Sequence, residues 1–204
     1  MSTVLDHPPV TPSRRFFTAD ELLQLPENHR FELVNGELVE RNMGWESEWI
    51  GSNLLTLLGI HCRQVSCGWV NGANAGYQCF EEVFPDDPDR TRKPDVSFIS
   101  RSRLERTQFP KGHCHVVPDF VTEVISKNDL YSEVEEKVVE YLRAGVRLVW
   151  VVDPRTESVR VHRADGTVSA LRVDGELSGE DVIPGFRCRV SELFQDPAKE
   201  ASGA

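Results

Sequence analysis

The middle of the chain constrains the fold most, because it places an amphipathic helix between apolar strand-like segments. PDVSFIS (94–100) and PDFVTEVIS (118–126) predict two strands, and the almost wholly apolar VRLVWVVDP (146–154) predicts a central strand. VEEKVVEYLRAG (134–145) predicts a helix that ends at Gly145, a natural C-terminal cap. Strand, strand, helix and strand in this order predict an α/β fold, in which a mixed sheet contains a right-handed helical crossover.

Segments on either side predict further helices and hairpins around this centre. The signals are a capping box, helical periodicity and the turn dipeptides Asn-Gly and Asp-Gly. The predicted elements are a short helix over 18–25, a hairpin over 31–40, a long amphipathic helix over 46–65, a hairpin or two short strands over 67–80, and a hairpin over 157–173.

Length and composition are those of one globular domain. Of the 204 residues, we expect 16–195 to form the domain and 1–15 and 196–204 to be flexible tails. No run of about 18 apolar residues and no signal-like start occurs, so a cytoplasmic protein without membrane contact is expected. The formal net charge of −10 argues against broad electrostatic binding of nucleic acid. It leaves room for a local basic cleft and favours acidic metal-binding clusters.

An acidic residue inside a predicted strand points to chemistry. Val121, Glu123 and Ile125 alternate onto one face of the strand. A carboxylate in a buried strand costs several kcal/mol unless it is paired, protonated or bound to a metal. Asp95 begins a neighbouring strand and is expected to bring a second carboxylate close. Mg²⁺ would offset their repulsion and keep water and substrate phosphate as its other ligands.

Lys137 is the third candidate, because it borders the apolar stripe of the predicted helix. Its long side chain can extend to solvent or reach the carboxylates and a bound phosphate. Each of the three residues also has an ordinary structural explanation. Asp95 is then a turn cap, Glu123 the partner of an arginine, and Lys137 a surface residue or the partner of Glu133.

Taken together, these segments resemble the Uma-two family of restriction-endonuclease-like proteins, within the PD-(D/E)XK nuclease superfamily. The resemblance rests on RKPDVSFI, PDFVTEVIS and EKVVEYLRAGVRLVWVVDP, with FELVNGEL near the start and IPGF near the end, and covers about residues 16–195. It implies a restriction-endonuclease-like core, a mixed β-sheet flanked by helices, with additional N-terminal and C-terminal β-hairpins. It also implies hydrolysis of DNA phosphodiester bonds with Mg²⁺, for which Mn²⁺ can substitute.

The resemblance assigns roles to individual residues. Asp95 matches the PD aspartate, Glu123 matches the acidic residue of the E-x-K element, and the backbone carbonyl of Val124 would complete the metal shell. Ile125 stands at the lysine position of that element, which is a departure from the superfamily pattern. Lys137, on the following helix, would supply the displaced positive charge.

Further residues are candidates for supporting roles. Glu32, in FELVNGEL, and Glu46, at the start of the long helix, match acidic positions of the family and are candidate metal ligands or supports for the ligands. Six basic residues around the PD strand are candidates for phosphate contacts: Arg90, Arg92, Lys93, Arg101, Arg103 and Arg106. A homodimer is expected by analogy, because cleavage of a duplex needs two active sites.

Two other functions remain open at this point. One is a nuclease fold that binds nucleic acid or another partner with little or no turnover. The other is an interaction protein in which Asp95, Glu123 and Lys137 form an ion-pair network. Metal-dependent cleavage that requires Asp95 would distinguish the nuclease from both.

Overall fold

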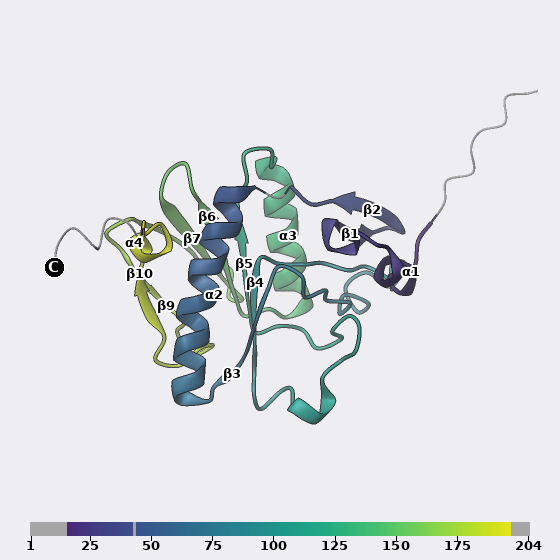
Figure 1. Ribbon diagram of the computed structural model, residues 1–204, viewed down its shortest axis with the longest axis horizontal. Coiled ribbons are helices and arrows are strands. Elements are labelled where there is room, and N and C mark those ends of the chain that lie inside the picture. The colour runs from purple at the N-terminus through teal and green to yellow at the C-terminus, as the bar shows by residue number, and fades with distance from the viewer. Residues whose placement is uncertain (1–15, 43, 197–204) are drawn as a thin grey trace, which may run out of the picture.

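A six-stranded mixed sheet forms the centre of the molecule, with one long helix against each face (Figure 1). The computed structural model describes residues 16–42 and 44–196. The strands, in spatial order, are β3 (Gly68–Gly72), β4 (Val96–Ser100), β5 (Phe120–Val124), β6 (Leu148–Asp153), β7 (Ser158–Arg163) and β8 (Val168–Arg172). The helices are α2 (Trp45–Val65) and α3 (Tyr131–Ala144). The predicted α/β fold class is confirmed.

The pairing of β5 with its two neighbours determines where the site forms. β4 runs antiparallel to β5, with Val96 opposite Thr122, so the start of β4 lies beside the end of β5. β5 and β6 run parallel, with Glu123 opposite Val151, and α3 connects them. This parallel pair with its crossover helix was predicted from the order of the segments.

Alternation along β5 divides its side chains between two cores. Phe120 and Val124 belong to the core that α2 covers. Val121 belongs to the core that α3 covers, together with Val138 of that helix. Glu123 shares the face of Val121 and is only 7% exposed. Its carboxylate is therefore held between the sheet and α3.

A small N-terminal unit packs beside the sheet, at the right of Figure 1. It contains α1 (Ala19–Gln24), the short 3-10 helix η1 (Asn28–Arg30), β1 (Phe31–Val34) and β2 (Glu37–Glu40). The predicted capping box at the start of α1 is present. The predicted hairpin is also present, and its turn residues Asn35 and Gly36 have φ angles of 51° and 72°, as a type I′ turn requires. Leu33 and Thr91 exchange backbone hydrogen bonds of 3.0 and 2.8 Å, which attaches β1 to the segment before β4.

The C-terminal part forms a second small sheet, which contains β9 (Glu176–Ser178) and β10 (Arg187–Arg189) and is followed by α4 (Val190–Leu193). The side-chain amide of Asn53 on α2 donates to the Leu193 carbonyl at 3.0 Å, which holds α4 against α2.

The prediction for residues 67–80 was wrong in part. This segment contains one strand, β3, which pairs with β4 and not with a second strand of its own. Tyr77 makes only isolated bridges, to Arg92 and to Cys114. The Gly- and Asn-rich composition of the segment suits a turn, but the unpaired edge of β4 provides a longer partner.

Two further expectations concern the chain as a whole. The predicted tails, 1–15 and 196–204, lie outside the described residues except for residue 196. In the part of the chain that the structure describes, no helix has both the length and the apolar surface that a membrane crossing requires.

Candidate active site

Asp95 and Glu123 lie at neighbouring strand ends. The Asp95 N–H donates to the Thr122 carbonyl at 3.0 Å, which continues the β4–β5 ladder by one residue. Beyond that point the Val124 N–H donates to Oδ2 of Asp95 at 2.7 Å. The N–H and C=O of one strand residue point to the same edge, so the Val124 carbonyl also faces the Asp95 side. Two carboxylates and a carbonyl oxygen are thus presented at one end of the β4–β5 pair.

Glu123 is held by two residues of α3 that lie one turn apart. The Tyr141 hydroxyl donates to its Oε1 at 2.7 Å, and Nζ of Lys137 lies 3.3 Å from its Oε2. Residues four apart on a helix project from the same face, so α3 presents both groups to β5 together. Each carboxylate oxygen has two acceptor positions, and both oxygens of Glu123 therefore retain capacity for another ligand.

Lys137 also reaches Glu32, which β1 brings to the same place. Nζ of Lys137 lies 3.2 Å from Oε2 of Glu32. That oxygen also accepts from Arg92 at 2.8 Å, and the Lys93 N–H donates to Oε1 at 2.8 Å. Burial alone would raise the pKa of Glu32, but Lys137, Arg92 and the Lys93 N–H outweigh it and lower the pKa to about 2. Burial opposes the charge of Lys137, but Glu123 and Glu32 together raise its pKa above the usual value. The ammonium group is therefore a permanent cation at working pH.

The basic residues that precede β4 serve this internal network. Arg92 binds Glu32 and Glu140, and Arg90 binds Asp87 and Glu140. Arg90, Arg92 and Lys93 are 5%, 6% and 2% exposed. The prediction that Arg90 and Arg92 contact phosphates was therefore wrong, because their guanidinium groups are buried against carboxylates.

Asp95 carries a negative charge that its surroundings offset only in part. Nη2 of Arg41 lies 3.1 Å from its Oδ1, and the same guanidinium donates to the Ala73 carbonyl at 3.0 Å. Burial, and then the charge of Glu123, raise the pKa of Asp95 to about 7, although Arg41, the Val124 N–H and Lys137 act in the opposite direction. The 21% exposure of the Asp95 side chain shows that it remains accessible.

A cleft of about 530 Å³ opens onto Asp95. One wall is the first half of α2, and the other is the end of β3 and the loop that follows it. Gly51 of α2 lies over Asp95, and a Cβ atom at that position would be 3.9 Å from the Asp95 Cβ. The lining residues are Ser47, Glu48, Gly51, Ser52, Leu55, Asn71, Gly72, Ala73, Asn74, Ala75 and Asp95.

The acidic residue of α2 that lines this cleft is Glu48, not the predicted Glu46. Glu46 is exposed in the first turn of α2 and is not among the lining residues. Two residues along a helix correspond to a rotation of more than half a turn, so Glu46 and Glu48 project in very different directions. The role predicted for Glu46 remains a prediction, and Glu48 is the better-placed carboxylate.

The oxygens at the strand ends fit a hard divalent cation. Mg²⁺ needs only one or two carboxylates and completes its octahedral shell with water and phosphate oxygens. Asp95 supplies an accessible carboxylate with incompletely offset charge, and the Val124 carbonyl faces the same side. Within residues 16–42 and 44–196, no three His, Cys, Asp or Glu side chains converge closely enough to form a metal site by themselves. Carboxylate and carbonyl oxygens of this kind suit Mg²⁺ or Mn²⁺.

Sequence reasoning missed three residues of this site. Tyr141 packs in the core on the buried face of α3, and its position four residues after Lys137 was a usable signal for a shared partner. Glu48 lies on the cleft side of α2, which its spacing from the buried Ser47 and Gly51 does not reveal. Arg41 follows a hairpin without any distinctive pattern, and only the tertiary fold brings it to Asp95.

Comparisons with known proteins agree with this architecture. The model of a family described as "Uma2: Putative restriction endonuclease" matches residues 19–191. A crystal structure described as a "putative nuclease belonging to DUF820", from Anabaena variabilis ATCC 29413, superposes with a TM-score of 0.71 at 19% sequence identity. The match covers 87% of this chain and 97% of the other, so the two share a fold. No curated protein matches the chain.

Proposed function

The chain belongs to the Uma2 family, and from this membership together with the site at Asp95 we propose that it is a metal-dependent endonuclease that hydrolyses phosphodiester bonds in DNA. The observation that carries the proposal is the under-compensated charge of Asp95 at the end of the β4–β5 pair. Burial and Glu123 together disfavour its carboxylate, which raises its pKa to about 7. A divalent cation would remove this conflict, and the accessible cleft gives a phosphate a route to it.

Asp95, Glu123 and the Val124 carbonyl would hold the ion, with Mg²⁺ as the expected metal and Mn²⁺ as a substitute. When bound, such an ion lowers the pKa of a coordinated water and stabilises the charge that develops on the phosphate. Asp95 also accepts the Val124 N–H at 2.7 Å, and this contact orients its carboxylate relative to the strand end.

Lys137 would act as a fixed positive charge and not as a proton acceptor. Its contacts with Glu32 at 3.2 Å and Glu123 at 3.3 Å keep it protonated and hold the ammonium in place. A cation in this position stabilises negative charge on a phosphate oxygen in the transition state. Ile125 occupies the usual lysine position of the E-x-K element. We infer that Lys137 supplies that charge from α3, where Glu32 and Tyr141 serve as positioning residues.

Cleavage assays test this proposal. The purified protein is incubated with supercoiled plasmid, linear duplex and single-stranded DNA in Mg²⁺, Mn²⁺ or EDTA. Asp95→Asn preserves the size of the side chain, and Asp86→Asn, at an exposed position, is its matched control. We expect metal-dependent cleavage by the wild type and by Asp86→Asn, with loss of cleavage in Asp95→Asn. We also expect Mg²⁺ to raise the melting temperature of the wild type but not of Asp95→Asn.

A second pair of variants compares the two acidic residues of α2. Glu48→Gln is expected to lower the cleavage rate or raise the Mg²⁺ concentration required, because Glu48 lines the cleft with Asp95. Glu46→Gln, on the same helix turn, tests the role predicted for Glu46 in the same assay, and we expect a smaller effect because Glu46 does not line the cleft.

Absence of cleavage on every substrate, together with no metal-induced rise in melting temperature, would refute the proposal. Asp95, Glu123 and Lys137 would then be an ion-pair network in a protein with a binding or structural role. The homodimer and the cytoplasmic location remain predictions that these assays do not address. Gel filtration and light scattering would test the first of them.

A further inference from the structure

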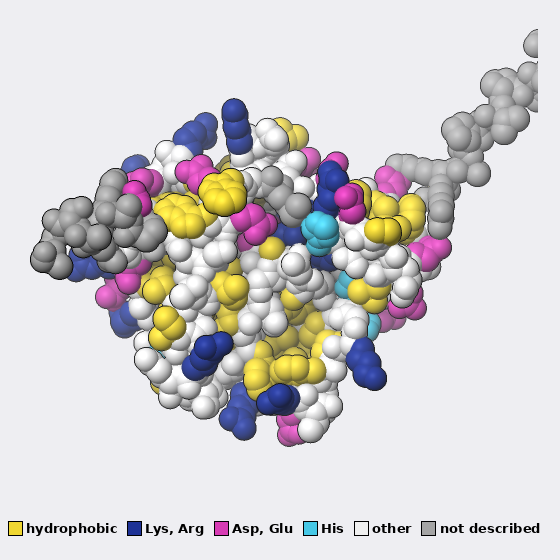
Figure 2. All heavy atoms as spheres, viewed as in Figure 1, with side chains coloured by type: hydrophobic (Ala, Val, Ile, Leu, Met, Phe, Trp, Pro, Cys, Tyr) yellow, Lys and Arg dark blue, Asp and Glu magenta, His cyan; other side chains and the backbone are white. Residues whose placement is uncertain are grey.

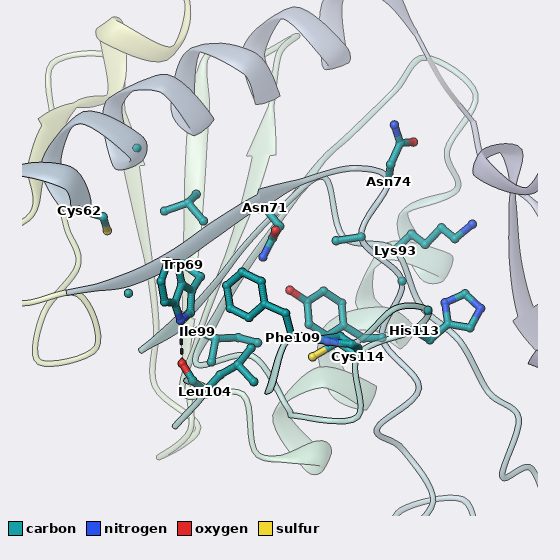
Figure 3. Close-up of a pocket in the computed structure, with 18 of the residues that line it drawn as sticks. Cys62, Trp69, Asn71, Asn74, Lys93, Ile99, Leu104, Phe109, His113 and Cys114 are labelled. Carbon is teal, nitrogen blue, oxygen red and sulfur yellow. Dashed lines mark hydrogen bonds between the residues drawn. The ribbon is translucent and has the colours of Figure 1, made fainter. Parts of the chain in front are cut away.

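A second and larger cavity, of about 710 Å³, lies along β3 next to the Asp95 cleft. Figure 3 shows Trp69, Ile99 and Leu104 at one end, Lys93 and His113 at the other, and Asn71 between them. The volume falls in the range of about 300–1,000 Å³ that is typical of small-molecule sites. It is large enough for a nucleotide and too small for a duplex.

The charge of this cavity is opposite to that of the molecule. The chain has a net charge of −10, yet the charged residues lining the cavity are Arg63, Lys93 and Arg101, with no acidic side chain among them. Figure 2 shows hydrophobic side chains gathered low on this face with Lys and Arg side chains around them. Such a surface is complementary to a ligand that combines an apolar ring with a negative charge.

Aromatic rings form the apolar end. The rings of Trp69 and Phe109 meet edge to face, with centroids 4.8 Å apart. Trp69 is fixed because its Nε1 donates to the Leu104 carbonyl at 2.7 Å, whereas Phe109 is 45% exposed. Flat aromatic surfaces of this kind bind nucleobases by stacking, whatever the base.

His113 provides an unsatisfied polar group at the opposite end. The residue is 6% exposed, and its Nε2 has no hydrogen-bond partner within the described residues. A Cβ atom at position 76 would lie 2.3 Å from Nδ1 of His113, so glycine is needed there to admit the ring. Burial, and then the charge of Lys93, lower the pKa of His113, so its ring is neutral. A neutral imidazole nitrogen can bond the edge of a base or a phosphate oxygen.

The cavity adjoins the proposed metal site. Asn71, Asn74 and Ala75 line both the cavity and the Asp95 cleft. Lys93, at the polar end, is two residues from Asp95, so their Cα atoms lie within about 7 Å of each other. A nucleic acid strand with one phosphate at Asp95 can therefore place a neighbouring nucleotide in the cavity.

We propose that the cavity receives one unpaired nucleotide of the DNA strand that is cut, with its base among Trp69, Phe109 and Ile99 and its phosphate towards the exposed basic lining residues Arg63 and Arg101. This inference rests on the proposed nuclease function and specifies its substrate class as single-stranded DNA, or duplex DNA with an unpaired nucleotide. Fully paired duplex would first have to unstack and unpair a base, which costs a few kcal/mol. The protein therefore selects strands in which this cost is already absent.

The test compares three labelled DNAs of one sequence: a single strand, a fully paired duplex, and a duplex with one unpaired nucleotide. Binding is measured by fluorescence anisotropy in EDTA, and cleavage in Mg²⁺. Phe109→Ala removes an exposed ring of the cavity, and Phe16→Ala, at a residue that is 64% exposed on another part of the surface, is the matched control. Phe109→Leu serves as a second variant that retains apolar volume without an aromatic face.

We expect the wild type to bind the single strand and the unpaired duplex at least tenfold more tightly than the paired duplex. Stacking energies predict that Phe109→Ala weakens binding of those two DNAs by about tenfold, with a smaller loss in Phe109→Leu and none in Phe16→Ala. Cleavage should show the same order of preference.

Two results would separate this inference from the proposed function. One result is metal-dependent cleavage of all three DNAs at equal rates, unchanged in both Phe109 variants. It would overturn the proposal that the cavity binds a nucleotide and would leave the proposed nuclease function standing. The other result is binding of unpaired DNA that depends on Phe109, without any cleavage. It would overturn the proposed nuclease function and support nucleotide binding in the cavity. Melting curves of both Phe109 variants that match the wild type establish that any loss reflects the ring and not the fold.

Discussion

Replacement of Lys137 by methionine removes one charge from the centre of the site and retains most of the side-chain volume. The Lys137 ammonium lies 3.2 Å from Glu32 and 3.3 Å from Glu123, whose side chains are 1% and 9% exposed. Removal of one partner from a buried ion pair costs about 3–5 kcal/mol, because the other charge is left without compensation. Both carboxylates keep other partners: Glu123 keeps the Tyr141 hydroxyl, and Glu32 keeps Arg92 and the Lys93 N–H. The free energy of unfolding should therefore decrease by an amount near the lower end of this range, about 3 kcal/mol.

Urea unfolding at 25 °C measures this loss directly, and the melting temperature gives a second estimate. For a chain of this size, about 3 kcal/mol corresponds to a fall of about 6–12 °C. The exposed Lys127, replaced by methionine in the same way, is the control and should change the free energy of unfolding by less than about 0.5 kcal/mol.

The pH dependence of the same variant tests the cause of the loss. The pKa of Lys137 is raised in the folded protein. Its contribution to folding stability is therefore complete below the unfolded-state pKa of about 10.4, and it disappears only as the pH rises through the folded-state pKa. Glu32, with its pKa lowered to about 2, contributes fully above the unfolded value of about 4.3 and loses this contribution as the pH falls towards 2. Both contributions are thus present in the wild type between about pH 5 and 9.

In Lys137→Met, Glu32 loses the charge that does most to lower its pKa, so its carboxylate takes up a proton more readily as the pH falls. The difference in stability between wild type and variant should therefore narrow from pH 8 to pH 5. A difference below about 1 kcal/mol at pH 7, or one that does not change with pH, would refute the argument that Lys137 compensates buried carboxylates.

Two other substitutions test separate parts of the site. Because the folded pKa of Asp95 is raised to about 7, its ionisation destabilises the fold as the pH rises from about 4 to above 7. Asp95→Asn should remove this dependence and melt at or above the wild-type temperature at pH 8 in EDTA; a clear fall in its melting temperature would contradict the prediction. Tyr141→Phe removes the hydroxyl that donates to Glu123 at 2.7 Å and should cost about 1.5–3 kcal/mol in urea unfolding, as for a hydrogen bond to a charged group. The exposed Tyr131→Phe is its control, and an equal effect of both would exclude a specific role of the Tyr141 hydroxyl.

Most of the secondary structure follows from local pattern. The capping box at Thr18, the Asn35-Gly36 turn and the cap at Gly145 each depend on a few neighbouring residues, and all three are present as predicted. The almost wholly apolar segment that became β6 needed no further information to be identified as a buried central strand. The error at residues 67–80 arose because strand pairing is a long-range choice. Local composition shows where a chain turns, but not which distant strand edge is free to pair.

In the candidate site, too, some residues could be identified from the sequence, whereas their partners became known only from the tertiary structure. Asp95, Glu123 and Lys137 were candidates from the chain alone. Strand and helix periods assign Glu123 and Lys137 to particular faces, and Asp95 begins a neighbouring strand. The partners of these residues come from other parts of the chain: Arg41 lies 54 residues before Asp95, and Glu32 lies 105 residues before Lys137. Which carboxylate is satisfied and which retains an uncompensated charge depends on those distant partners. Periodicity specifies the direction of a side chain, but only the packed tertiary structure specifies what that side chain meets, and the pKa of Asp95 is the consequence.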